Sequence, residues 1–130
     1  MRIRVVGIIV QNGKLLLLKG RYKELWTPGG KIDLDESDEE CLKRELKEEI
    51  GVKLTEITFF KEYSGDSFYQ ANEIMKQRVY IVSIEGEPKA SAEIQDTIWI
   101  TKEEFQQQKY PLIPITEKEI IPDLIEQGIF

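Results

Sequence analysis

The sequence predicts an α/β protein in which helices pack against β-strands, and three observations lead to this fold class. Apolar runs typical of strands occur in both halves of the chain. A segment with helical periodicity and capping signals lies between them. Two further helical segments follow the last strand pattern. Because the order is strands, helix, strands and helices, it indicates a mixed α/β sandwich rather than a regular alternation of strand and helix.

Two strands and a long loop are predicted before the central helix. Residues 2–10, RIRVVGIIV, are rich in β-branched side chains and predict one buried strand. Asn12 and Gly13 follow, a pair that favours a two-residue hairpin turn. The return strand is then KLLLLK, residues 14–19. Residues 20–36 are rich in Gly, Pro and Asp and predict a loop.

The central helix is predicted from Asp38 to Ile50. Ser37 and Glu40 have the spacing of a capping box, and the acidic first turn suits the helix dipole. Gly51 stands where a helix commonly ends on a glycine. Both boundaries of this helix therefore have a local signal.

The second half of the chain is predicted to hold three strands and two helices. Thr101 suits the start of the first of these helices, and Pro122 is expected to kink or delay the second. In chain order the segments are strand 53–64, strand 73–85, strand 97–100, helix 101–108 and helix 116–130.

Composition limits the possible functions. The 130 residues suit one compact domain over residues 1–130. The chain has no histidine, which excludes a Ser-His-Asp triad and a histidine zinc site. A net charge of -6 without a long basic run argues against binding to duplex nucleic acid. No apolar run is long enough to cross a membrane, so no membrane partner is expected.

The single cysteine, Cys41, excludes an intrachain disulfide and fits a cytoplasmic protein. Its apolar neighbours predict that Cys41 is a buried packing residue rather than a nucleophile. The chain also has no histidine that could activate the thiol.

Three carboxylates gather on one side of the predicted helix. At 100° per residue, Glu45, Glu48 and Glu49 fall within about 100° of one another. Such a group is commonly a solvated surface, but it can also hold a hard cation such as Mg²⁺, which prefers oxygen ligands. Glycines in the preceding WTPGGKIDLDE segment would let the backbone approach a ligand, which favours the second interpretation.

From Gly30 the residues run G-x5-E-x7-R-E-L-x-E-E-x-G-V. This string is similar to the Nudix box, G-x5-E-x7-R-E-U-x-E-E-x-G-U, in which U is a bulky aliphatic residue. A chance match is on the order of 10⁻⁸ per starting position. The matching fixed positions are Gly30, Glu36, Arg44, Glu45, Glu48, Glu49 and Gly51, and Leu46 and Val52 fill the aliphatic positions. The chain therefore resembles the Nudix hydrolases, which implies an α/β/α sandwich with a mixed β-sheet and a loop-helix-loop box.

The resemblance implies a Mg²⁺-dependent hydrolase that acts on a nucleoside diphosphate linked to another moiety, with Mn²⁺ as a substitute. The first expectation is a MutT-like (d)NTP pyrophosphohydrolase with a small-molecule nucleotide substrate. Hydrolysis of ADP-ribose, nucleotide sugars or dinucleoside polyphosphates, and a non-catalytic nucleotide-binding regulator, stay open as alternatives. A homodimer also stays open, because VVGIIV and the C-terminal LIEQGIF could pack against a partner or inside the monomer.

The resemblance also implies roles for individual residues. Arg44 resembles the residue that orients the glutamates by ion pairing, and Glu36 resembles the one that supports the loop. The proton acceptor is either a box glutamate or a glutamate of a later loop. In that loop Glu93 is the first candidate and Glu87 the second. The implied metal ligands are the Gly30 carbonyl, Glu45, Glu48 and Glu49, and the implied catalytic residues are Arg44, Glu48, Glu49 and Glu93.

Basic and aromatic residues near the box are candidates for substrate binding. Arg21 is the first candidate for the outer phosphate, ahead of Lys19 and Lys31. Trp26 could stack on a base or belong to the core. The other aromatic candidates for stacking are Tyr22, Phe68 and Tyr69.

Overall fold

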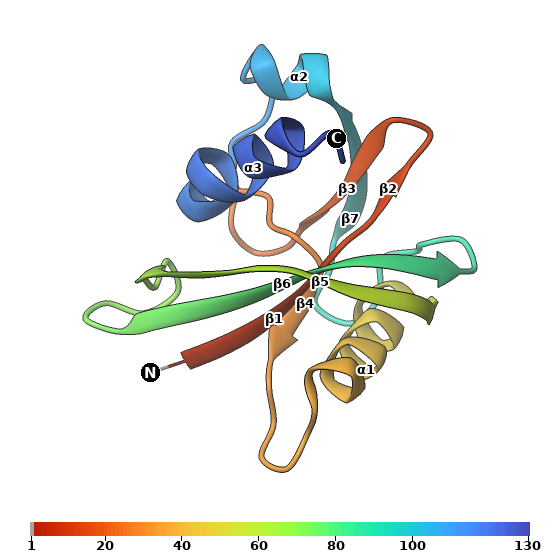
Figure 1. Cartoon of the computed structure of the whole chain (residues 1–130), viewed down its shortest axis with the longest axis vertical. Helices are drawn as coiled ribbons and strands as arrows, with labels where there is room; N and C mark the ends of the chain where they lie inside the picture. Colours follow the sequence, from red (N-terminus) through yellow and green to blue (C-terminus); the bar gives the residue numbers. More distant parts are fainter. Residues whose placement is uncertain (1) are drawn as a thin grey trace.

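The computed structural model describes residues 2–130 and arranges them as two β-sheets with helices on either side (Figure 1). None of the helices in this range is long and apolar enough to span a membrane. The strands are β1 (Arg2–Ile8), β2 (Val10–Gln11), β3 (Lys14–Lys19), β4 (Gly29–Lys31), β5 (Lys53–Asp66), β6 (Ile74–Glu85) and β7 (Asp96–Thr101). The helices are α1 (Asp38–Ile50), α2 (Lys102–Gln106), the π-helical segment η1 (Thr116–Ile120) and α3 (Ile121–Glu126).

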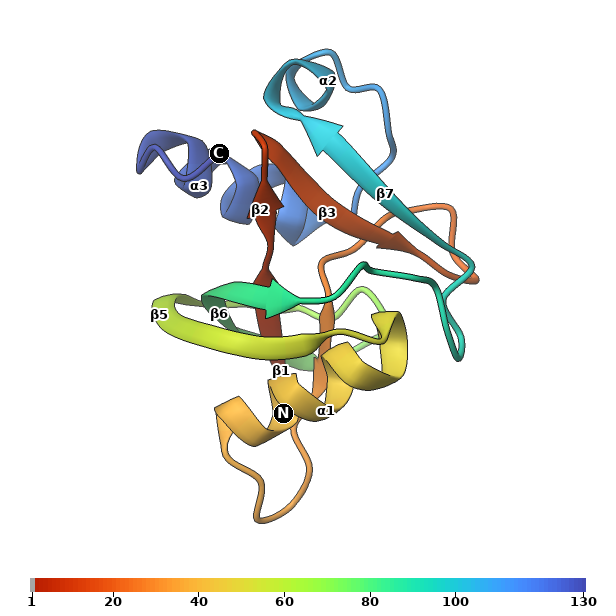
Figure 2. The ribbon, with the colours of Figure 1, turned by 90° about the vertical axis from the view of Figure 1, so that its right-hand side faces the viewer.

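The larger sheet has the order β4-β1-β6-β5 and mixes both strand directions. Strand β1 runs parallel to β6 and antiparallel to β4, and β5 is antiparallel to β6. Helix α1 lies on one side of this sheet, and α3 lies on the other (Figures 1 and 2). The predicted mixed α/β fold is therefore confirmed, with a second sheet, β2-β3-β7, that the sequence did not indicate.

The predicted strand over residues 2–10 is wrong as a single strand. Strand β1 ends at Ile8, and Val10 already pairs with Leu15 in the second sheet. Ile9 lies between the two sheets and is buried in the core. The hairpin at Asn12 and Gly13 is confirmed, since both residues have positive φ angles, 52° and 74°.

The predicted loop over residues 20–36 contains the short strand β4, which is the second correction. Gly29–Lys31 pairs with Arg4, Val5 and Val6 of β1. Two glycines give no strand signal in a sequence, because glycine is depleted in strands. A Cβ atom on Gly29 would collide with the carbonyl oxygen of Val5, so only glycine fits here. This pairing places the glycines at the sheet edge, in contact with α1.

Helix α1 has the predicted bounds and both predicted ends. Ser37 Oγ accepts a hydrogen bond from the Glu40 N–H at 3.1 Å, and Glu40 Oε1 accepts one from the Ser37 N–H at 3.0 Å. Gly51 closes the helix with a φ of 68°. Asp38 in the first turn accepts hydrogen bonds from the Tyr80 hydroxyl and from Arg78 NH1, which fasten the start of the helix to β6.

Alternating strand residues supply two separate hydrophobic clusters. One cluster joins Val5, Leu16 and Leu18 to the apolar side of α1, including Leu46. The other joins the intervening strand residues, such as Val6, to the C-terminal helices. Most of the apolar run VVGIIV is therefore buried within this molecule, which leaves the expectation of a homodimer untested.

Pro122 does not delay the C-terminal helix, because helical backbone precedes it in η1 and continues after it in α3. A proline has no N–H to donate within a helix, and it crowds the preceding turn. The structure accommodates it with the wider turn η1, in which the Ile121 N–H donates to the carbonyl of Thr116, five residues earlier. The helix then continues as α3 to Glu126.

Candidate active site

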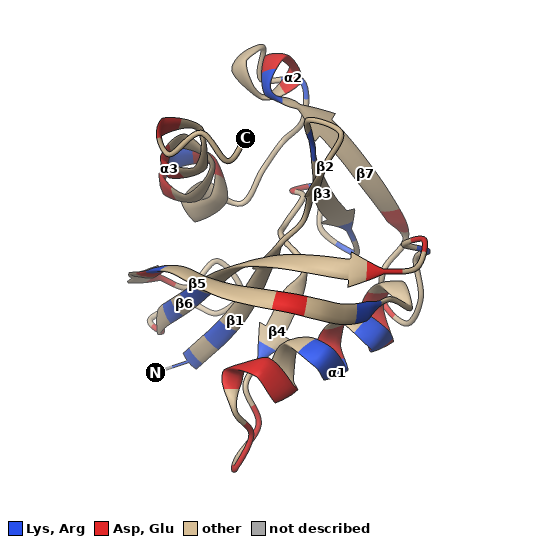
Figure 3. Cartoon of the chain, turned by 45° about the vertical axis from the view of Figure 1, so that its right-hand side comes forward, with Lys and Arg blue, Asp and Glu red and all other residues tan. Residues whose placement is uncertain are grey.

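A cavity of about 740 Å³ lies between helix α1 and the larger sheet. Its helix wall is formed by Glu45, Glu48 and Glu49, and its sheet wall by Arg2, Arg4 and Met75. Acidic and basic positions are interspersed along α1 (Figure 3). The sequence-predicted residues that line the cavity are Arg21, Tyr22, Trp26, Gly30, Lys31, Glu45, Glu48, Glu49, Tyr69 and Glu93. The lining residues do not include the other candidates Lys19, Glu36, Arg44, Phe68 and Glu87.

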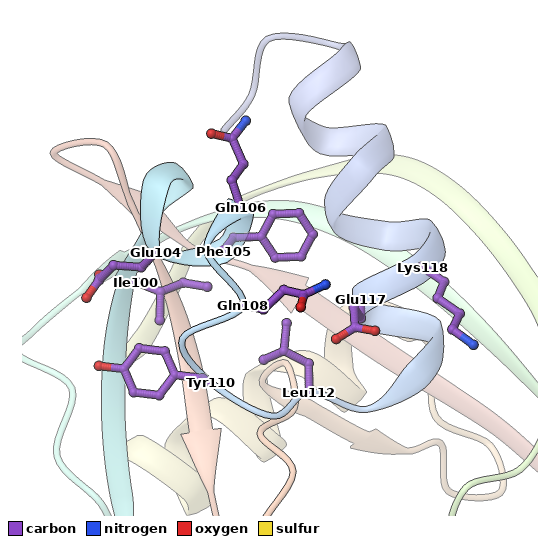
Figure 4. Close-up of a pocket in the computed structure, with 9 residues that line it drawn as sticks. All are labelled: Ile100, Glu104, Phe105, Gln106, Gln108, Tyr110, Leu112, Glu117 and Lys118. Carbon is purple, nitrogen blue, oxygen red and sulfur yellow. The ribbon is translucent and has the colours of Figure 1, made fainter.

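A second, smaller cavity lies between β7, α2 and the start of the C-terminal helix (Figure 4). It has a volume of about 260 Å³ and is lined in part by Phe105, Tyr110 and Leu112. None of the predicted site residues borders it. The larger cavity is therefore the candidate active site.

Glu49 is the most deeply placed of the three helix carboxylates. Its Oε1 accepts a hydrogen bond from the Gly29 N–H at 3.0 Å. Burial raises the pKa of Glu49 to about 7, although the nearby positive charge of Arg4 and the Gly29 N–H act in the opposite direction. The carboxylate thus lies in a site where its negative charge is only partly compensated.

Glu45 lies directly beside Gly30 of strand β4. Its Oε1 accepts a hydrogen bond from Arg44 NH1 at 2.8 Å. Burial is the main cause that raises the pKa of this carboxyl group. A Cβ atom on Gly30 would lie 2.5 and 2.6 Å from the two Glu45 carboxylate oxygens. Gly30 is therefore needed to leave room for this carboxylate.

Glu48 extends toward solvent, with 57% of its side chain exposed. Among residues 2–130, no three acidic, cysteine or histidine side chains converge closely enough to hold a metal ion as they stand. The donor set nevertheless fits a hard divalent cation, because the carboxylates of Glu45, Glu48 and Glu49 line one wall of the cavity and supply the oxygen atoms that such a cation prefers. A cation would have to draw these side chains together.

Arg44 fixes the loop before the helix. Its Nε donates to Glu36 Oε2 at 2.7 Å, and its NH2 donates to Glu36 Oε1 at 2.9 Å. These bonds hold the pKa of Glu36 down at about 2. The i, i+4 partner Glu48 lies farther from Arg44 NH1, at 3.7 Å, so Arg44 mainly joins the loop to Glu45.

The loop before β7 reaches the cavity because it bonds to the end of α1. The Ser91 N–H donates to the Glu49 carbonyl and the Lys89 N–H to the Ile50 carbonyl, both at 3.0 Å. These carbonyls belong to the last turn of the helix, where carbonyl groups have no N–H partner within the helix itself. The loop thereby brings Glu93 to the cavity rim, where its side chain is exposed.

Tyr22 and Tyr69, which line the cavity, belong to a group of aromatic side chains that also includes Phe68. The Tyr22 and Phe68 rings are 5.4 Å apart, and Tyr22 and Tyr69 are 6.1 Å apart. Arg21 NH2 donates to the Tyr22 hydroxyl at 2.8 Å, which orients Arg21 at the rim. Trp26 borders the cavity and also packs against the core cluster beside α1. Its stacking on a base stays a prediction.

The sequence reasoning missed the sheet wall. Arg2, Arg4 and Met75 had no assigned role, yet all three line the cavity. The available signal was the alternation of arginine with apolar residues in RIRVVGI, which places Arg2 and Arg4 on one face of a strand.

Comparisons with known proteins bear on the family and the fold of this chain. The family model of the NUDIX domain matches residues 1–124. The chain is 42% identical over 62 residues to an 8-oxo-dGTP diphosphatase of Buchnera aphidicola subsp. Schizaphis graminum, covering 44% of this chain and 48% of that protein. It is 31% identical over 115 residues to the CTP pyrophosphohydrolase of Escherichia coli, covering 85% of this chain and 82% of that protein.

The chain spans about half the length of the Buchnera protein and 11% of two mRNA-decapping proteins of Saccharomyces cerevisiae that it also matches. Among solved structures, the E. coli ORF135 protein superposes with a TM-score of 0.75 at 28% identity. That match covers 95% of this chain and 90% of the other.

Proposed function

Since this chain belongs to the NUDIX domain family, we propose that it is a nucleoside triphosphate pyrophosphohydrolase that uses a divalent cation. Mg²⁺ is the expected cation, with Mn²⁺ as a substitute. The observation that carries the proposal is the cavity itself, in which the carboxylates of α1 face basic and aromatic side chains. The relatives named for 8-oxo-dGTP and CTP support nucleoside triphosphates as the substrate class.

The charges of the site explain why a cation is needed. A triphosphate would be repelled by Glu45, Glu48 and Glu49 in a protein of net charge -6. A bound divalent cation would supply the compensating charge and activate the attacking water. Arg21 and Lys31, which also border the cavity, would pair with the phosphate oxygens.

The chain supplies two candidates for the proton acceptor. Water attacks phosphorus, the bond to the leaving pyrophosphate breaks, and the proton of the water passes to a carboxylate. Glu93 at the rim is exposed, and its loop is held near α1 by the bond from the Ser91 N–H to the Glu49 carbonyl. A helix glutamate is the alternative, and Arg44 keeps this wall in position through Glu36 and Glu45.

The proposal is tested by assaying a panel of nucleoside triphosphates with Mg²⁺ and with EDTA. We expect nucleoside monophosphate and pyrophosphate as products with Mg²⁺ alone, and a loss of about 100-fold or more in Glu48→Gln. Glu39→Gln is the matched control, because Glu39 lies on the same helix, is exposed and pairs with Lys43 at 3.4 Å. Release of phosphate instead of pyrophosphate, or equal turnover in EDTA, would overturn the proposal.

A further inference from the structure

Arg4 is a buried arginine of β1 whose two terminal nitrogens are bonded to one short segment. The residue is only 6% exposed. Its NH2 donates to the Thr27 carbonyl at 2.6 Å and to the Gly29 carbonyl at 3.5 Å, and its NH1 donates to Thr27 Oγ1 at 3.3 Å. Thr27 is buried as well, so these bonds are shielded from water. Arg4 therefore holds the backbone of residues 27–29 from inside the protein.

The same segment leads into the glycines that contact the helix carboxylates. The Gly29 N–H donates to Glu49 Oε1 at 3.0 Å. Gly30 lies so close to Glu45 that an added Cβ atom would meet its carboxylate. Gly29 thus accepts a hydrogen bond from Arg4 at its carbonyl and donates one to Glu49 from its N–H. Arg4 is thereby linked to the helix wall of the cavity through a single residue.

The charge of Arg4 also acts on the helix wall. Burial raises the pKa of Glu45 and of Glu49, and the positive charge of Arg4 opposes this rise in both. The ion pairs found among residues 2–130 include none with Arg4, so its attraction acts across a longer distance. A positive charge near these carboxylates also repels a cation that binds them. The charge of Arg4 and its hydrogen bonds therefore have opposite effects on cation affinity, and a measurement of that affinity separates them.

We propose that Arg4 is a positioning residue for the helix carboxylates, although it lies outside the box of residues 30–52. It holds Thr27 and Gly29 in place so that the Gly29 N–H orients the Glu49 carboxylate before a cation arrives. A ligand that is already oriented loses less conformational freedom when it binds, which raises the affinity for the ion. The inference rests on the divalent cation of the proposed function.

The first test measures the Mn²⁺ affinity of the metal-free protein by electron paramagnetic resonance. If Arg4 acted through its charge alone, Arg4→Met would bind Mn²⁺ more tightly, because a repulsive charge is removed. Positioning predicts the opposite, a loss of affinity of about tenfold or more. Arg4→Lys keeps the charge but cannot reproduce the bonds of a guanidinium to Thr27 and Gly29, so its affinity should also fall. Unchanged or tighter binding in Arg4→Met would overturn the inference, and the same criterion applies to Arg4→Lys if Arg4→Met does not fold.

Two controls separate the bonds of Arg4 from its charge. Arg2→Met removes a positive charge from the same cavity, but Arg2 pairs with Glu73 at 3.0 Å rather than with residues 27–29. Its Mn²⁺ affinity should stay the same or rise. Thr27→Val removes Oγ1 but keeps the carbonyl that accepts the shorter bond from Arg4, so its affinity should stay within about threefold of the wild type. A tenfold loss in Arg2→Met would overturn the inference, because positive charge in the cavity would then account for the effect.

A second measurement needs neither metal nor turnover. Amide hydrogen exchange of the metal-free protein, followed by nuclear magnetic resonance, reports on the Gly29 N–H, which its bond to Glu49 should protect. In Arg4→Met and Arg4→Lys this exchange should become at least tenfold faster. The Leu16 N–H, which donates to the Ile9 carbonyl at 3.0 Å, is the reference and should keep its rate. Equal acceleration of both amides would show a general loss of stability and would refute a positioning role.

The inference and the proposed function can fail separately. If triphosphates are hydrolysed but Arg4→Met binds Mn²⁺ as the wild type does, the inference fails and the proposed function holds. If triphosphates are not hydrolysed but Mn²⁺ affinity and Gly29 exchange change as expected, the proposed function fails and the positioning role of Arg4 holds.

Discussion

Arg44 donates two hydrogen bonds to the Glu36 carboxylate, from Nε to Oε2 at 2.7 Å and from NH2 to Oε1 at 2.9 Å. This bidentate pair connects the loop before the helix to α1. The third guanidinium nitrogen, NH1, donates a hydrogen bond to Glu45 Oε1. Since Arg44 does not line the cavity, it acts on the site only through these carboxylates. The pair therefore supports the cavity wall that carries Glu45.

Arg44→Lys should weaken activity and the apparent affinity for Mg²⁺ by about 10- to 100-fold, because an ammonium group cannot make this bidentate pair. The measurement is kcat together with the Mg²⁺ concentration that gives half-maximal rate. The neighbouring Lys43→Gln, which loses only a surface pair with Glu39, should change neither value. An unaltered Mg²⁺ dependence in Arg44→Lys would contradict the supporting role.

Gly30→Ala and Gly51→Ala should have opposite consequences. A Cβ on Gly30 meets the Glu45 carboxylate, the far end of a flexible side chain, so the fold should survive while activity falls at least tenfold. Gly51 has a φ of 68° and no atoms near an added Cβ, so the cost is strain of about 1 kcal/mol in folding stability, with activity retained. Thermal denaturation and kcat/KM measured on both variants check this; a stable, fully active Gly30→Ala would refute it.

Cys41 should be inert in the folded protein. The thiol is buried on α1, and burial raises its pKa to about 12, so almost no reactive thiolate exists at neutral pH. Iodoacetamide at pH 8 should label Cys41 only after denaturation, as measured by mass spectrometry. Rapid labelling of the native protein would show that this part of the core opens.

Asp123 should make the docking of α3 sensitive to acid. Its Oδ2 accepts hydrogen bonds from the Tyr63 hydroxyl at 2.7 Å and from Lys61 Nζ at 2.9 Å, and both lower the pKa of Asp123. A lowered pKa in the folded state means that the stabilisation is complete above the unfolded-state pKa of about 3.9. It is lost as the pH falls through the lower, folded-state value.

We therefore expect Asp123→Asn to reduce stability at pH 7 by about 0.5–1 kcal/mol, a value discounted for solvent screening. The difference from the wild type should shrink below about pH 4, as shown by urea denaturation at several pH values. Asp66→Asn, at an exposed strand end, is the control. A difference that is constant with pH would exclude ionised Asp123 as its source.

The sequence predicted those features whose signals are local. Helix α1 has its predicted bounds because Ser37, Glu40 and Gly51 act within a few residues of its ends. The sequence did not predict strand β4, nor that the chain passes from the first sheet to the second at Ile9. Both features depend on pairing with other strands. A strand that begins with two glycines exists only because β1 offers it an edge.

The candidate site shows the same division. The three glutamates follow from a motif in one segment, and the structure places all of them on one cavity wall. Arg4 belongs to a strand far away in the sequence, and only the arrangement of β1 beside β4 and β6 brings it to that cavity. Its partner Thr27 is likewise 23 residues distant.

The most direct test of the central claim, that the carboxylates of α1 hold a divalent cation, is a titration of the metal-free protein with Mn²⁺ alone. Electron paramagnetic resonance would measure the free ion. We expect one Mn²⁺ site for which Mg²⁺ competes. Its affinity should fall by about tenfold or more in Glu48→Gln and Glu49→Gln and stay unchanged in Glu39→Gln. Equal Mn²⁺ binding by all four proteins would contradict the account, because the cation would then be held elsewhere.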